Sequence, residues 1–191
     1  MPALLRAFVA VEIPEDLLAA LEAAQSDLKR RMRARWVRAG SMHLTLKFLG
    51  DIPAGHVASV ADALQAAAGG HTTFSLTVSG IGVFPSIRRP RVIWAGLSGP
   101  TGRLLDLQRS LEERLVALGF PREERPFRGH LTIGRFSEPV ESERLAEVVN
   151  SFASRIFGGF AVKELVLFQS DLQPKGPVYT ALARARLKES F

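Results

Sequence analysis

Apolar and polar residues alternate with a period of two in two short segments that are near copies of each other, residues 43–48 and 130–136. A period of two predicts β-strands, because successive side chains of a strand point to opposite faces. Each copy begins with histidine, leucine, threonine and a further aliphatic residue, and the copies are 87 positions apart (130 − 43). One face of each strand should therefore carry a histidine and a threonine, and the residues concerned are His43, Thr45, His130 and Thr132.

The remaining chain alternates between strand-like and helix-like patterns. Strands are expected over residues 4–13, 74–84, 91–97, 160–168 and 178–187, and helices over residues 14–34, 53–68, 104–118 and 141–157. The order strand, helix, histidine strand, helix, strand thus occurs twice, over about residues 4–85 and 91–187, with one extra strand at the end. Gly80 and Gly82 predict a bulge or a close backbone approach in the strand that contains them.

This internal repetition predicts an α+β fold, in which a duplicated two-lobe arrangement with pseudo-twofold symmetry forms a single bilobal domain over residues 1–191. Mostly antiparallel sheets should face a central cleft, with the helices outside and the histidine strands facing one another across the cleft. A hydrophobic content of 47% is sufficient for one substantial core or two small packed lobes.

Composition narrows the chemistry. The chain has no cysteine, which excludes disulfides, thiolate metal sites and cysteine nucleophiles and is typical of a reducing cytoplasm. Nothing reads as an export signal, and the first apolar stretch is too short to span a membrane. The formal net charge is +6, and 20 of the 25 basic residues are arginine, which favours a polyanionic partner bound through forked phosphate contacts.

The candidate chemistry follows from the two repeated histidines. No cysteine nucleophile, glycine-rich phosphate loop or acidic metal cluster accompanies them, so the pattern favours hydrolysis or transesterification by general acid and base. The unperturbed pKa of imidazole, about 6.5, lets one ring accept a proton while the other donates one. The hydroxyls of Thr45 and Thr132 can donate hydrogen bonds to phosphate oxygens. These residues alone leave open which histidine takes which role. His56 and His71 have no matched partner and are expected at the surface.

The paired His-Leu-Thr-Leu and His-Leu-Thr-Ile sequences resemble the duplicated His-x-Thr-x motif of the 2H phosphoesterase superfamily. Within it, the chain is similar to the RNA 2′,3′-cyclic phosphodiesterase branch, also described as 2′-5′ RNA ligase-like. The flanking segments that share this similarity are residues 6–10, 35–37, 48–50, 82–85 and 90–94.

The resemblance implies hydrolysis of RNA 2′,3′-cyclic phosphate ends to 2′-phosphate ends without a metal or a cofactor. It implies that His43 is the proton donor and His130 the proton acceptor, and that Arg135 binds the substrate phosphate together with Thr45 and Thr132. The implied partner is RNA that ends in a cyclic phosphate, with tRNA fragments among the candidates, and the protein is expected to be a monomer.

Two residues depart from a simple reading of the second motif. Arg135 lies five residues after His130, so strict alternation points it to the opposite face unless Gly134 hosts a bulge or the strand ends there. Gly129 stands where proline is common in the family, which would alter the approach of the preceding loop without removing the acid-base pair.

Aromatic and basic residues near the motifs have two interpretations. Trp36, Trp94 and Phe48 could stack on a nucleobase, but core positions are the stronger expectation. Arg88 and Arg89, in the turn between the half-repeats, either contact an RNA backbone or are solvated. Three other functions stay open at this point, namely ATP-independent 2′-5′ RNA ligation at the same site, hydrolysis of a small-molecule cyclic phosphodiester, and RNA binding without catalysis.

Overall fold

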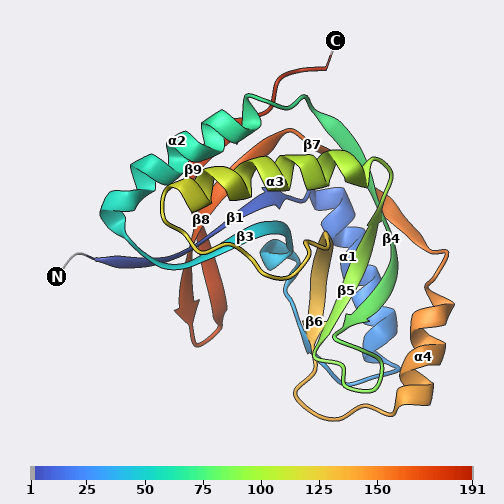
Figure 1. The fold of residues 1–191 in the computed structure, drawn as a ribbon. Helices are drawn as coiled ribbons and strands as arrows, with labels where there is room; N and C mark the ends of the chain where they lie inside the picture. Colours follow the sequence, from blue (N-terminus) through green and yellow to red (C-terminus); the bar gives the residue numbers. More distant parts are fainter. Residues whose placement is uncertain (1–2, 191) are drawn as a thin grey trace.

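The chain forms four α-helices and one sheet in the part that the computed structural model describes, residues 3–190 (Figure 1). The strands are β1 (Leu4–Glu12), β2 (Arg35–Trp36), β3 (His43–Pro53), β4 (Phe74–Phe84), β5 (Val92–Ser98), β6 (His130–Arg135), β7 (Ile156–Val162), β8 (Glu164–Gln173) and β9 (Gly176–Arg186). The helices are α1 (Glu15–Lys29), α2 (Val57–Ala68), α3 (Thr101–Ala117) and α4 (Ser142–Ser151), with short 3-10 turns η1 (Ala39–Ser41) and η2 (Ala54–His56). No helix in residues 3–190 is long and apolar enough to cross a membrane.

The sheet is antiparallel and nearly symmetric about its centre, which confirms the predicted fold class. Its order is β7-β4-β5-β6-β3-β1-β8-β9, with β2 paired to β6. The first group, β3, β1, β8 and β9, therefore mirrors the second group, β6, β5, β4 and β7. The two histidine strands, β3 and β6, are direct neighbours where the groups meet, and their register is set by the pair Leu44 and Leu131. The expectation that the histidine strands face one another across a cleft is wrong, because both groups belong to one curled sheet in which these strands lie side by side (Figure 1).

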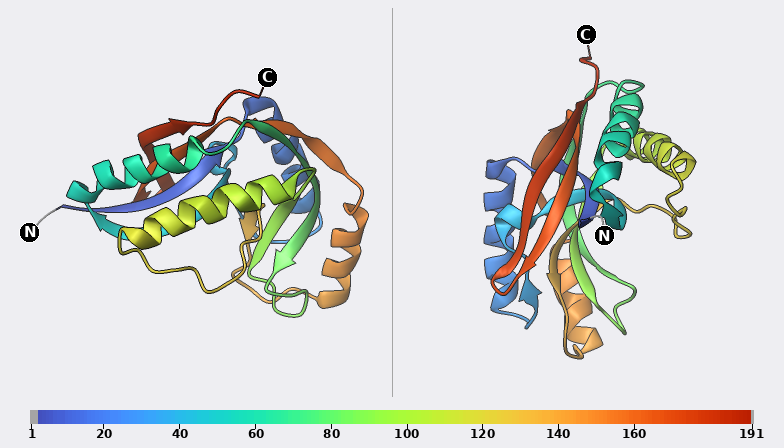
Figure 2. Two further views of the ribbon diagram at one scale, coloured as in Figure 1. Left: turned by 45° about the horizontal axis from the view of Figure 1, so that its top comes forward. Right: turned by 90° about the vertical axis from the view of Figure 1, so that its left-hand side faces the viewer.

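Each group of strands contains strands from both halves of the sequence. β4 comes from the first half but pairs with β5 and β7, whereas β8 comes from the second half and pairs with β1. The short turn after β4 favours its pairing with β5, because antiparallel strands need only a short connection. The helices likewise pack against elements from the other half of the sequence. α1 packs against β7 and α4 against β4, while α2 packs against β8, β9 and α3. In the right-hand view of Figure 2, α2 and α3 lie on the opposite side of the molecule from α1.

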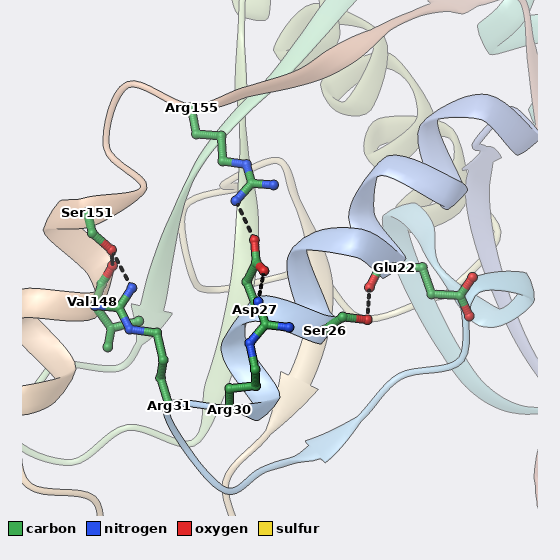
Figure 3. Close-up of polar contacts among 8 residues, drawn as sticks. All are labelled: Glu22, Ser26, Asp27, Arg30, Arg31, Val148, Ser151 and Arg155. Atoms are coloured by element: carbon green, nitrogen blue, oxygen red, sulfur yellow. Dashed lines mark hydrogen bonds and ion pairs between the residues drawn. The ribbon is translucent and has the colours of Figure 1, made fainter.

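Polar contacts fasten α1 to the second group (Figure 3). Asp27 accepts a hydrogen bond from Arg155, just before β7, at 2.9 Å, and Arg31 donates to Ser151 of α4 at 2.8 Å. The Asp27–Arg155 ion pair is substantially exposed, so it contributes little to stability.

Apolar side chains between the sheet and the helices form the main core. The alternating leucines of the histidine strands point into it, since Leu44 and Leu131 are fully buried. Some predicted boundaries differ. α1 ends at Lys29 instead of continuing to residue 34, and the backbone N–H groups of Arg31 and Met32 both donate to the carbonyl oxygen of Leu28 in the turn that follows. α3 ends at Ala117, which leaves Leu118 outside the predicted apolar stripe and 42% exposed.

The two glycines of β4 have the two predicted roles. Gly80 has a φ of +65° and is the extra residue of a bulge, because the pairing with β5 skips from Ser79 to Ile81. Gly82 lies against an indole, and a Cβ built on it would be 2.3 Å from Cη2 of Trp94. The face of Trp94 thus needs a residue without a side chain beside it.

We expect Gly82→Ala to lower the free energy of unfolding by about 1–3 kcal/mol, because the indole of Trp94 must move out of a packed position. Thermal unfolding measures this as a fall of roughly 2–4 °C per kcal/mol for a chain of this size. Gly102→Ala is the control, because a Cβ there meets nothing within 4 Å and alanine is favoured in a helix. Equal melting temperatures for the two variants would contradict the close approach.

Candidate active site

The repeated histidines and threonines lie on one face at the centre of the sheet, as the alternation predicts. Leu44 and Leu131 are paired directly and point to the opposite, buried face. In an antiparallel ladder the residues on either side of such a pair are also opposite one another. Each histidine therefore lies beside the threonine of the other copy, and these cross-strand pairs are His43 with Thr132 and Thr45 with His130.

This register makes His43 and His130 diagonal neighbours across the two strands. Diagonal neighbours in an antiparallel sheet are about 7–8 Å apart. Both side chains are partly buried, and so are the two threonines. Two imidazoles and two hydroxyls are thereby brought together on one face of the paired strands.

A bulge interrupts β3 just after its histidine and threonine. The pairing with β1 runs from Thr45 opposite Ala10 to Lys47 opposite Val9, so Leu46 is the extra residue. A bulge of this kind resets the alternation of the strand. Leu46 and Lys47 are both buried, and the next residue, Phe48, returns to the outside with 69% of its surface exposed.

A second bulge occupies the corresponding place in β6. The pairing with β5 runs from Thr132 opposite Trp94 to Gly134 opposite Ile93, which leaves Ile133 as the extra residue. Ile133 and Gly134 are both buried, and Arg135 after them is exposed. The bulge expected near Gly134 is therefore present, and it turns Arg135 back to the face of the histidines. Burial is the largest cause of the lowered pKa of His130, and the charge of Arg135 lowers that pKa further.

Aromatic rings surround His43. Phe8 of β1 stacks on the imidazole with a centroid distance of 4.7 Å, and Tyr179 of β9 meets it edge-on at 5.2 Å. Burial lowers the pKa of His43 to about 4, and a backbone hydrogen bond with Ser41 offsets part of this effect. A pKa of about 4 keeps the ring neutral near pH 7.

His130 has a backbone partner that orients its ring. Its Nδ1 lies 2.7 Å from the carbonyl oxygen of Arg128, and a proton on Nδ1 would be donated to that oxygen. The tautomer that this contact favours leaves Nε2 free to accept a proton. Burial lowers the pKa of His130, the hydrogen bond to Arg128 opposes this, and the charge of Arg135 lowers it further. Phe84 meets the ring edge-on at 5.1 Å.

The other candidate residues lie at different distances from the histidine face. The expectation that Phe48 is a core residue is wrong, because the bulge places it on the exposed histidine face. Trp36 and Trp94 are partly buried, and Trp94 lies 6.3 Å from His130 between ring centroids. Arg88 and Arg89 are exposed in the turn after β4. His56 is exposed on η2, and His71 is partly buried, so neither joins the site.

Metal donors do not gather near the histidines. Among residues 3–190, no group of three or more histidine, cysteine, aspartate or glutamate side chains is placed to hold a metal ion.

A family model described as "LigT like Phosphoesterase" matches residues 11–94 and 97–179. The chain belongs to this family. Its relatives include proteins named RNA 2′,3′-cyclic phosphodiesterase. One, from Methanothermobacter thermautotrophicus, is 36% identical over 183 residues, which cover 95% of this chain and 98% of the relative. Another, from Thermotoga maritima, is 35% identical over 180 residues, with 93% of each chain covered. The resemblance to the 2H phosphoesterases is thus confirmed.

Solved structures of the family share the fold. TT0787 of Thermus thermophilus superposes with a TM-score of 0.80 at 29% identity, covering 97% of this chain and all of that protein. Escherichia coli LigT in its apo form gives a TM-score of 0.75 at 26% identity, with 97% and 98% coverage.

Three aromatic residues near His43 escaped sequence reasoning. Phe8 lies on β1, which is remote in the sequence from β8 and β9, where Phe168 and Tyr179 lie, and Phe8 stacks on Phe168 at 5.4 Å. A signal existed for Phe8, because β1 is apolar on both faces where one buried face would be enough. The strand exchange hid the rest, since nothing in the sequence placed β8 beside β1.

We expect the buried His43 to make the protein sensitive to acid. Because its pKa is about 4 in the folded chain and about 6.5 when unfolded, the unfolded state takes up a proton first as the pH falls. The free energy of unfolding should drop by about 3 kcal/mol from this residue between pH 6.5 and pH 4.

Urea unfolding at pH 7.0 and pH 4.5 measures this drop. Glutamine does not titrate, so the free energy of unfolding of His43→Gln should fall less than that of the wild type between the two pH values. His56→Gln should show the wild-type fall, because His56 is exposed. Identical pH dependence in the two variants would contradict the burial of His43.

Proposed function

We propose that the protein is a phosphodiesterase that hydrolyses RNA 2′,3′-cyclic phosphate ends to 2′-phosphate ends. The observation that carries this proposal is the group of two histidines and two threonines on one face of the paired strands β3 and β6. Relatives that align over nearly their whole length and bear the name RNA 2′,3′-cyclic phosphodiesterase support it. The family's two-histidine chemistry supports hydrolysis without a metal.

In the proposed reaction His130 is the general base and His43 the general acid. Nε2 of His130 takes a proton from water as the water oxygen forms a bond to phosphorus. The bond from phosphorus to the 3′ oxygen breaks, and His43 gives that oxygen its proton. The resemblance to the family supplies this direction, and Nε2 of His130 is free for its part as base.

The remaining polar groups would stabilise the phosphate. Thr45 and Thr132 donate hydroxyl hydrogen bonds to the non-bridging oxygens, and the guanidinium of Arg135 neutralises charge on the same group. The bound anion would also change the protonation of His43. A negative charge close to the ring raises its pKa from about 4, so substrate binding itself would charge the acid that the reaction needs.

The two flanks of the site differ, which suggests how an RNA end is oriented. The flank beside His43 is aromatic, with Phe8 inside and Phe48 exposed, and their ring centroids are 6.1 Å apart. The flank beside His130 carries Arg135. A terminal nucleoside would place its base against Phe48 and its phosphate toward Arg135, since bases stack on exposed aromatic rings. The monomeric state, the cytoplasmic location and tRNA fragments as the natural substrate stay predictions.

We expect His43→Ala and His130→Ala each to slow hydrolysis of a short RNA 2′,3′-cyclic phosphate by roughly 10²–10⁴-fold, because each removes one proton-transfer group. Rates are measured by chromatography of the product, and phosphorus NMR identifies the phosphate position. His56→Ala is the control and should keep the wild-type rate.

The same assay covers the other functions. Added chelator should leave the rate unchanged. A 3′-phosphate product would refute the proposed bond cleavage. Wild-type activity in either site variant would refute the mechanism, and RNA binding without any hydrolysis would favour a non-catalytic role.

Stacking on Phe48 has its own test. We expect Phe48→Ala to raise KM about tenfold for an RNA cyclic phosphate, in line with the contribution of one base–aromatic contact, and to change kcat little. The variant should match wild type on ribose 2′,3′-cyclic phosphate, which has no base. Ile156→Ala removes an equally exposed apolar side chain from β7 and is the control. An equal loss on both substrates would show that Phe48 does not contact the base.

A further inference from the structure

Three of the four buried polar side chains in residues 3–190 lie at the two bulges of the histidine strands. The buried polar residues in the described chain, residues 3–190, are Gln25, Lys47, Gln108 and Glu112. Gln25 reaches the bulge of β6 from α1, and Glu112 of α3 reaches the bulge of β3 through Lys47. Burying polar groups is unfavourable unless they are hydrogen-bonded, so this concentration at two points needs a reason.

The amide of Gln25 holds the bulge of β6. Its Nε2 donates to the carbonyl oxygen of Ile133 at 2.7 Å and to that of Val37 at 2.7 Å. Ile133 is the extra residue of the bulge, and its oxygen also accepts from the backbone N–H of Val37 at 3.0 Å. Gln25 itself is only 2% exposed. The bulged peptide is thereby tied to α1 and to the segment after β2, two residues before Arg135.

An ion pair holds the bulge of β3. Nζ of Lys47 donates to Oε1 of Glu112 and to the carbonyl oxygen of Pro121, both at 2.8 Å. Oε1 of Glu112 also accepts from the backbone N–H of Glu123 at 2.7 Å. The two side chains are 5% and 8% exposed. The bulge one residue before Phe48 is thereby tied to α3 and to the loop that leads to His130.

The two arrangements correspond through the internal repeat. Gln25 and Glu112 are 87 positions apart (112 − 25), the same spacing as His43 and His130. Each comes from one half of the sequence and reaches the histidine strand of the other half. The contacts are therefore crossed, and each half of the chain fixes the geometry of the other.

We propose that Gln25 and the Lys47–Glu112 pair are positioning residues that hold the two bulges and thereby keep Arg135 and Phe48 on the histidine face. This inference rests on the proposed function for its assay. A slip of one residue in either strand would turn these two side chains to the opposite face, because the alternation has a period of two. Gln25 acts on Arg135, and the ion pair acts on Phe48.

Stability alone does not account for the ion pair. Oε2 of Glu112 is buried and has no hydrogen-bond partner among the described residues, which is unfavourable for a carboxylate. Replacing a buried ion pair by apolar side chains of similar volume is often neutral or stabilising. A role in geometry explains why polar groups occupy these places.

Double-mutant cycles on kcat/KM test the crossed pattern. Gln25→Leu should lower kcat/KM for an RNA cyclic phosphate by about tenfold, as a misplaced binding group does. The same change should cost less than about twofold when Arg135→Ala is already present, because the group it positions is gone. In the Phe48→Ala background it should again cost about tenfold. The double replacement Lys47→Met with Glu112→Met should show the reverse pattern, coupled to Phe48 and independent of Arg135.

The control is Gln108→Leu, which removes a buried amide of the same size from α3. Gln108 has no hydrogen bond to either bulge among the described residues, so its variant should keep the wild-type kcat/KM whatever its melting temperature. Gln25→Met replaces Gln25→Leu if the latter does not fold, and the Lys47 and Glu112 arm is independent of both. The inference would be overturned if the fold-losses in kcat/KM of the single variants multiply in every double variant. It would also be overturned if Gln25→Leu keeps the wild-type kcat/KM, as the Gln108→Leu control should.

Binding of inorganic phosphate, measured by calorimetry, separates this inference from the proposed function. Gln25→Leu and Arg135→Ala should each weaken phosphate binding, and together no more than Arg135→Ala alone. That result without any hydrolysis of cyclic phosphate would refute the proposed function and leave the inference standing. If cyclic phosphate is hydrolysed but Gln25→Leu and Arg135→Ala weaken phosphate binding independently, the proposed function would stand and the inference would be refuted.

Discussion

The backbone pairing of β3 with β6 is the constraint on which the site depends. Leu44 and Leu131 lie opposite one another at the centre of the sheet, and both are fully buried. Because the strands are antiparallel and carry the same motif, this one pair brings the histidine of each copy beside the threonine of the other. The catalytic candidates need no flexible loop to meet. Their spacing is a property of the sheet, and rigid elements hold such spacing more precisely than loops do.

A symmetric backbone here carries asymmetric side chains. The two strands have matching bulges, yet the residue after each bulge differs, with Phe48 in one copy and Arg135 in the other. The histidines differ as well, since burial lowers the pKa of His43 to about 4, whereas for His130 the charge of Arg135 adds to the effect of burial on the pKa. Two chemically equal histidines would have no defined acid and base. The unequal surroundings supply the difference that directional proton transfer needs.

The sequence was sufficient for the parts of the site that follow from local pattern. Alternation put the histidine and the threonine of each copy on one face of its strand. The repeat predicted that the two strands meet, but across a cleft and not as neighbours in one sheet. Arg135 required knowledge of a bulge, which depends on how β5 pairs with β6, and Phe48 was misassigned for the same reason. The aromatic surroundings of His43 could not be predicted, because they arise from the pairing of β1 with β8, more than 150 positions away in the chain. Long-range strand pairing has no local signature in the residues that take part.

The exchange of strands between the halves also bears on how long the chain must be. A single half-repeat would contain β1 and β3 as a pair but would leave β4 without either of its partners. It would also leave the outer edge of β1 open, where β8 now pairs. Unpaired edges of this kind associate with other chains. A half-length polypeptide could complete this sheet only by pairing with a second copy. Because the two halves are joined in one chain, β1 and β4 find all their partner strands within the same molecule.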